Sequence, residues 1–114
     1  MNLTLEVKDR DGIGILEVSG EVDLYTVPQL REALTEMAQR WKRFAVDLDG
    51  VSFIDSTGLG VLVGGLKRAR DGGGDLELIC SQAQILRVFE ITGLTSVFSI
   101  HASSEGAVEA TPPR

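Results

Sequence analysis

Strict alternation of apolar and polar residues opens the chain. Leu3, Leu5 and Val7 are separated by single polar residues, and this period of two predicts a half-buried strand. Asp11-Gly12 is a turn signal, so residues 13–19 are expected to return as the second strand of a hairpin. Three later apolar runs predict three further short strands, over residues 44–48, 76–80 and 97–100.

Between the predicted hairpin and the strand at residues 44–48, apolar residues recur at steps of three and four, as on one face of a helix. That face comprises Val27, Leu30, Leu34, Met37 and Trp41. Thr26 and Gln29 fit a capping box at its start, and Tyr25 and Leu30 fit a hydrophobic staple. We therefore expect a helix that begins directly after Thr26.

The same start signals recur near residue 81. Ser81 and Gln84 fit a second capping box, Cys80 and Ile85 fit a second staple, and Gly93 is placed to end the helix. Two more helices are expected, from about residue 56 to Arg70 and over residues 103–110.

This order of elements decides the fold class. Strands that alternate with helices predict a single α/β domain with a mixed, mostly parallel central sheet of about five strands and about four helices. We place that domain at residues 1–110, with residues 111–114 as a disordered tail.

Composition and charge then exclude several functions. The chain has 114 residues and a net charge of −6, whereas a nucleic-acid binder usually carries a basic surface. No apolar run reaches the roughly 20 residues needed to span a bilayer. One cysteine, Cys80, and one histidine, His101, form neither an internal disulfide nor a zinc site. We expect a cytoplasmic protein with no metal, cofactor, nucleic-acid or membrane partner.

The segment after residue 55 departs from ordinary helix composition. It holds four glycines, Gly58, Gly60, Gly64 and Gly65. Each costs roughly 0.5–1 kcal/mol relative to alanine inside a helix, so something must approach the backbone closely. For Gly58 and Gly60, together with Leu59, we predict an approaching partner surface. For Gly64 and Gly65, packing on the protein's own sheet is an equal alternative.

Asp55-Ser56-Thr57 lies at the start of this glycine-rich helix. Asp55 or Ser56 fits a plain N-cap. A hydroxyl here is equally well placed to carry a phosphate, because a helix N-terminus stabilises anions. The residues alone leave both interpretations open.

The run from Phe53 to Gly64, Phe-Ile-Asp-Ser-Thr-Gly-Leu-Gly-Val-Leu-Val-Gly, resembles the signature of the STAS-domain anti-sigma factor antagonists, most of all their actinobacterial members. Three other segments resemble landmarks of the same family: Ser19-Gly20-Glu21-Val22-Asp23, Gly73-Gly74-Asp75-Leu76 and Ile91-Thr92-Gly93-Leu94. The resemblance extends over nearly the whole chain, and its central motif is specific.

The resemblance implies a partner-switching regulator rather than an enzyme. The unphosphorylated form would bind an anti-sigma factor, itself a serine kinase of the GHKL ATPase type, and so release a sigma factor. That kinase would phosphorylate Ser56, with Thr57 as the secondary acceptor, and a PP2C-type phosphatase would reverse the modification. The partner surface would comprise Asp23, Asp55, Ser56, Thr57, Gly58, Leu59 and Gly60.

Simple electrostatics agrees with such a switch. A phosphoserine adds about −1.5 to −2 charges, which the helix N-terminus tolerates but which a partner facing Asp23 and Asp55 would not. A loss of about 3–4 kcal/mol lowers affinity by roughly two to three decades. Phosphorylation is therefore expected to block an interface rather than refold the domain.

Three rival functions remain open at this stage. Ser56 and His101 are candidates for a hydrolytic triad, although the G-x-S-x-G elbow is absent. Gly58-Leu59-Gly60 begins a nucleotide-binding pattern, but Val63 stands where a third glycine belongs. A scaffold or sensor-complex role within the same family is the third.

Overall fold

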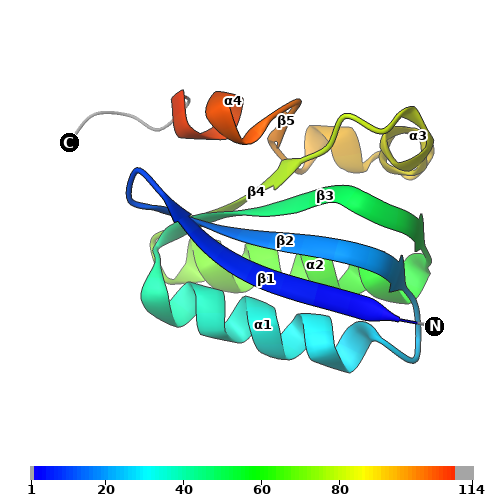
Figure 1. The fold of residues 1–114 in the computed structure, drawn as a ribbon, viewed down its shortest axis with the longest axis horizontal. Helices are drawn as coiled ribbons and strands as arrows, with labels where there is room; N and C mark the ends of the chain where they lie inside the picture. Colours follow the sequence, from blue (N-terminus) through cyan, green and yellow to red (C-terminus); the bar gives the residue numbers. More distant parts are fainter. Residues whose placement is uncertain (1, 110–114) are drawn as a thin grey trace.

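The computed structural model describes residues 2–109 and arranges them as a twisted sheet with helices on both sides (Figure 1). The strands are β1 (Leu3–Arg10), β2 (Ile13–Val22), β3 (Arg43–Ile54), β4 (Asp75–Ile79) and β5 (Ile100–His101). The helices are α1 (Val27–Arg40), α2 (Ser56–Asp71), α3 (Ala83–Ile91) and α4 (Ser104–Glu109), with a short 3₁₀ helix η1 (Leu94–Ser96).

The order of strands across the sheet follows their order in the chain, β1-β2-β3-β4-β5. β1 and β2 form the antiparallel hairpin, and Asp11 and Gly12 at its turn have the positive φ angles that such a tight turn requires. The pairs β2–β3, β3–β4 and β4–β5 are parallel. Within residues 2–109 this confirms the predicted mixed, mostly parallel sheet and the α/β class.

Most of the apolar core lies on one face of the sheet. Figure 1 shows α1 and α2 side by side along that face. The helix face predicted from the apolar periodicity supplies Val27, Leu30, Leu34 and Met37, all buried. α3 adds Ile85 and Phe89, and the Phe89 ring meets Phe98 edge-on at 5.9 Å between centroids.

The opposite face carries a smaller core beneath α4. Ile13, Ile15, Ala45 and Ile79 pack there against Ala107. Farther along β2 and β3, the side chains on this face are polar. Apolar side chains therefore follow the whole length of only one face of these two strands.

Several predicted boundaries were wrong. β2 continues to Val22 and β3 to Ile54, because register shifts after Glu17 and after Gly20 keep these strands paired beyond the apolar runs. At the other end of the sheet, residues 97–100 do not form the predicted strand. η1 and its C-cap Val97 occupy the start of that segment, and only Ile100 and His101 pair with β4. The predicted tail, residues 111–114, lies outside the described residues.

The second predicted capping box was also wrong. Gln82, not Ser81, is the N-cap of α3, and it makes no side-chain capping bond. The Ser81 amide and hydroxyl instead donate to Asp49 Oδ1. The Gln82 amide nitrogen donates to the main-chain carbonyls of Asp49 and Val51. Ser81 and Gln82 therefore bind the middle of β3 rather than the start of α3. Gly93 follows α3 in the left-handed conformation, as expected of a residue that ends a helix.

Candidate functional site

Two parallel strands end together and bring two aspartates to one edge of the sheet. Val22, the last residue of β2, pairs with Ile54, the last residue of β3. The next residues are Asp23 and Asp55, and the Asp55 amide donates to the Val22 carbonyl at 3.1 Å. This is the carboxyl edge of a parallel pair, where α/β folds place their sites.

Asp23 organises the turn between β2 and α1. Its side chain is buried, and its Oδ1 accepts hydrogen bonds from the amides of Tyr25 and Thr26 at 2.9 and 3.0 Å. The Thr26 hydroxyl accepts from the Asp23 amide and donates to the Glu21 carbonyl at 2.8 Å. The carboxylate is thus fixed by the main chain of its own loop.

These bonds correct the first predicted helix start. Thr26 precedes α1 as expected, but its hydroxyl makes no capping bond to the helix. The hydroxyl is already engaged by the Asp23 turn, because short polar side chains compete for nearby main-chain groups. Tyr25 is 77% exposed and does not form the predicted staple with the buried Leu30.

Asp55, and not Ser56, is the N-cap of α2. Its Oδ1 accepts from the Gly58 amide at 3.0 Å, as an N-cap side chain does. Ser56 is the first residue of α2, and its side chain is exposed. Within residues 2–109 the Ser56 hydroxyl has no hydrogen-bond partner, and the half-buried Thr57 hydroxyl has none either. The Ser56 hydroxyl is therefore exposed at the start of α2, in the segment that directly follows Asp55.

The glycines of α2 serve different purposes. A Cβ at Gly58 would lie 2.6 Å from Val22 Cγ1 and 2.9 Å from Ile54 Cγ1, so this glycine lets α2 pack directly on β2 and β3. The prediction that a partner surface explains Gly58 was therefore wrong. Leu59 is also buried and belongs to the core, so neither residue offers a side chain to a partner. Gly60 faces open space.

The other two glycines divide between the two alternatives. A Cβ at Gly65 would approach Leu34 and Leu76 at 3.0 and 3.2 Å, which is packing inside the protein. A Cβ at Gly64 would meet only the end of the flexible Arg68 side chain, at 3.8 Å.

Sequence reasoning missed three exposed apolar side chains near Ser56. Leu24 and Tyr25, in the loop after Asp23, are 62% and 77% exposed, and Phe53, near the end of β3, is 48% exposed. Large apolar side chains that are solvent-exposed together often mark an interaction surface. Their signal in the sequence was the placement of three such residues next to the two aspartates. We call Asp23, Asp55 and Ser56, with Leu24, Tyr25 and Phe53, the Ser56 edge.

His101 does not join the Ser56 edge. Its Nε2 lies 2.6 Å from Glu77 Oε1, and Glu77 Oε2 accepts from Arg43 Nε at 2.9 Å. We call Arg43, Glu77 and His101 the Glu77 cluster. Among the described residues no bond links His101 to Ser56, so the hydrolytic triad considered above is not assembled.

Two further classes of site are absent from the part of the chain that the structure describes. No group of three or more histidine, cysteine or acidic side chains there could hold a metal ion. No helix among those residues is long and apolar enough to cross a membrane.

Comparisons with known proteins agree with this geometry. The STAS domain model matches residues 4–107. An anti-sigma-B factor antagonist of Bacillus subtilis is 39% identical over 109 residues, which cover 96% of this chain and 100% of that protein.

Two solved structures have a similar fold. The crystal structure of an anti-sigma factor antagonist from Mycobacterium paratuberculosis has a TM-score of 0.87 at 27% identity, covering 96% of this chain and 93% of the other. The Bacillus cell fate determinant SpoIIAA in its phosphorylated form has a TM-score of 0.69 at 23% identity, covering 95% of this chain and 97% of the other.

Proposed function

The chain belongs to the STAS domain family, and on that premise we propose that it is an anti-sigma factor antagonist. In this proposal the unphosphorylated protein binds an anti-sigma factor in the cytoplasm and thereby releases a sigma factor. The names of the B. subtilis and mycobacterial proteins, which match almost the whole chain, support the assignment.

We further propose that Ser56 is the switch residue. The observation that carries this proposal is the exposed Ser56 hydroxyl, which stands at the start of α2 directly after Asp55 and has no hydrogen-bond partner among residues 2–109. A bound anti-sigma factor that is a GHKL-type serine kinase would transfer the γ-phosphoryl group of ATP to this oxygen, releasing ADP and the hydroxyl proton. A PP2C-type phosphatase would hydrolyse the phosphoester and restore the hydroxyl. Thr57 is the secondary acceptor, and its half-buried position makes it harder to reach.

The electrostatics of the Ser56 edge supports blocking of an interface. The amides of the first turn of α2 stabilise an added phosphate, so the fold of the domain is retained. The solved phosphorylated form of SpoIIAA indicates that a domain of this fold accommodates phosphate. A partner that covers Leu24, Tyr25 and Phe53 would remove water from the same edge. Burying a doubly charged phosphate beside two carboxylates then opposes binding strongly.

The proposal is tested with three baits in a pull-down from a lysate of the source cell: wild type, Ser56→Ala and Ser56→Asp. Proteins are identified by mass spectrometry, and affinity for the captured kinase is measured by calorimetry. Ser99→Asp is the matched control, because it adds the same charge at another exposed serine.

We expect wild type, Ser56→Ala and the control to hold a GHKL-type kinase, and Ser56→Asp to bind it at least about 100-fold more weakly. Incubation with ATP should phosphorylate wild type and leave Ser56→Ala unmodified. Equal capture by all baits would contradict the switch. Elution of the pure protein as a very large particle would instead favour the scaffold role.

A further inference from the structure

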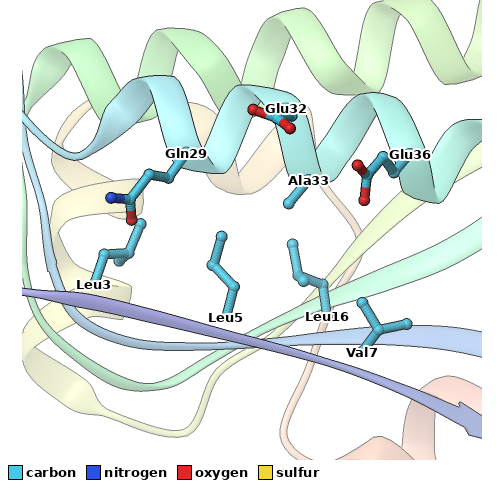
Figure 2. A pocket seen from close by; sticks show the side chains of 8 residues that line it. All are labelled: Leu3, Leu5, Val7, Leu16, Gln29, Glu32, Ala33 and Glu36. Carbon is cyan, nitrogen blue, oxygen red and sulfur yellow. The ribbon is translucent and has the colours of Figure 1, made fainter.

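A groove runs between β1 and α1 (Figure 2). Its volume is about 370 Å³. Leu3, Leu5 and Leu16 point from the strands toward α1, and Ala33 faces them from the helix. Glu32 and Glu36 stand along the helix at the rim. The groove thus combines an apolar floor with an acidic wall.

The strand that borders this groove is the edge of the sheet. Among the described residues β1 pairs only with β2, so its outer edge is open to another strand. Charged side chains at the edge of a sheet usually prevent such pairing. In β1 the charged residues are Glu6, Lys8, Asp9 and Arg10, mostly in its second half, while Leu3 and Leu5 lie in the first half, beside the groove. The first half of β1 is therefore the part that remains available for pairing.

The charges of the groove indicate the chemistry of its occupant. Glu32 and Glu36 are exposed, and neither makes an ion pair or hydrogen bond within residues 2–109. Of the two cations of β1, Lys8 is 3.2 Å from Glu17 and Arg10 is 3.6 Å from Glu105, so both are already paired. A second copy of this chain would bring another net charge of −6 to the acidic wall. The acidic wall therefore attracts a basic partner and repels a second copy of this chain.

We propose that this groove binds an extended basic segment of a partner protein, added to β1 as a further strand with lysine or arginine at every second position. Glu32 and Glu36 are one turn apart, about 6 Å along the helix axis. Alternate residues of a strand are about 6.6–6.8 Å apart, so two basic side chains on one face match the two carboxylates. Their aliphatic stems cover Leu3 and Leu5, while their charged ends reach the rim.

This interaction goes beyond the proposed switch and does not depend on it. The groove is formed by α1 and β1, whereas Ser56 begins α2. A partner that inserts a basic strand can therefore bind in both phosphorylation states. Changes at Ser56 are expected to leave binding in the groove within about twofold.

The test uses a fluorescein-labelled peptide, Thr-Lys-Thr-Lys-Val-Lys-Thr, and fluorescence anisotropy with the full chain. A second peptide of the same composition groups the three lysines together and so removes the alternation. The double variant Glu32→Gln/Glu36→Gln removes the acidic wall. The double variant Asp71→Asn/Glu90→Gln is its control, because both residues are exposed acids elsewhere and the change in net charge is the same.

We expect the alternating peptide to bind wild type and the control equally, and Glu32→Gln/Glu36→Gln at least about tenfold more weakly. The grouped peptide should also bind at least about tenfold more weakly than the alternating one. Thermal melts of all variants verify that they fold. Absence of binding at millimolar peptide, or equal loss in both double variants, overturns the proposal. Peptide-sensitive dimerisation in sedimentation equilibrium also overturns it, because the occupant would then be a second copy.

Discussion

The Ser56 edge and the Glu77 cluster both hold fixed carboxylates, but in opposite ways. At the Ser56 edge, Asp23 and Asp55 accept hydrogen bonds from main-chain amides and from no cationic side chain that the structure describes. In the Glu77 cluster, a buried carboxylate lies between the Arg43 guanidinium and the His101 ring. The carboxylates of the first arrangement are held by amides alone, whereas the carboxylate of the second is held by side chains.

This difference indicates which acid groups are available for function. A buried acid that is held by charged side chains contributes to stability and leaves nothing for a partner to contact. An acid that is held by main-chain amides has a fixed position, from which it can oppose a new phosphate. The comparison therefore separates the internally bonded acid of the Glu77 cluster from the amide-bound acids of the Ser56 edge, where we propose that regulation takes place.

The largest expected effect is on the Glu77 cluster. Glu77→Gln removes the carboxylate that joins β4 to Arg43 and His101, and we expect a loss of about 2–4 kcal/mol in the free energy of unfolding. Urea denaturation measures this loss, with Glu90→Gln as an exposed control. Binding of the folded variant to its anti-sigma factor should not change. A loss below about 0.5 kcal/mol in the free energy of unfolding would contradict a structural role for the Glu77 cluster.

The next expected effect is a difference in stability between alanine variants of two glycines in α2. Gly58→Ala places a methyl group against Val22 and Ile54, and we expect it to destabilise the protein by about 1–3 kcal/mol. Gly60→Ala adds a methyl group in open space and should stabilise the helix by about 0.5–1 kcal/mol. Thermal melts of the two variants measure both signs. Similar changes in both would show that Gly58 is not a packing position.

A smaller effect is expected at the cap of α2. Asp55→Ala removes the side chain that accepts from the Gly58 amide and should cost about 1 kcal/mol. Asp55→Asn retains an accepting oxygen and serves as the control, losing only the charge. If the charge of Asp55 opposes the phosphate, phosphorylated Asp55→Asn should regain part of its binding to the anti-sigma factor in a titration. No recovery would remove Asp55 from the switch.

The smallest effect concerns Asp47, on the same sheet face as Glu77 but without a cation in contact. Burial, and then the nearby charges of Asp49 and Glu17, raise the pKa of the Asp47 carboxyl above its ordinary value. The folded protein therefore holds this proton to higher pH than the unfolded chain, and stability falls as the pH rises through that range.

Asp47→Asn should consequently raise the free energy of unfolding at pH 7 by less than about 1 kcal/mol, with the gain disappearing below pH 4. Urea denaturation at several pH values measures this trend. If Asp47→Asn is less stable than wild type at pH 7, the Asp47 carboxylate stabilises the fold as the Glu77 carboxylate does. The prediction that these two acids differ would then be wrong.

The elements of the fold that depend on local patterns were predictable. The strand predicted from Leu3, Leu5 and Val7 appears as β1, although Val7 is exposed, and the helical face from Val27 to Met37 is buried as expected. The ends of β2 and β3 were not, because register shifts and pairing between distant strands keep them extended beyond their apolar runs. The short β5 was missed for the same reason, since only its pairing with β4 defines it.

The candidate site divides in a similar way. The sequence placed Asp55 and Ser56 at a helix start, because capping is a local effect. It did not distinguish Gly58 from Gly60, since that difference depends on how α2 sits over Val22 and Ile54. Nor did it predict that Asp23 would fix its own loop and use the Thr26 hydroxyl, which removes the capping box.

The sequential strand order has a consequence for how the domain is made. Because each strand pairs with its predecessor in the chain, no strand has to enter between two that are already paired. The hairpin of β1 and β2 leaves the ribosome before the later strands, and each later strand can pair with an edge strand that has already formed. N-terminal parts of a protein generally fold first during synthesis. The domain can thus assemble in the direction of translation, and the edge that carries Ser56 is complete only after β3 has paired with β2.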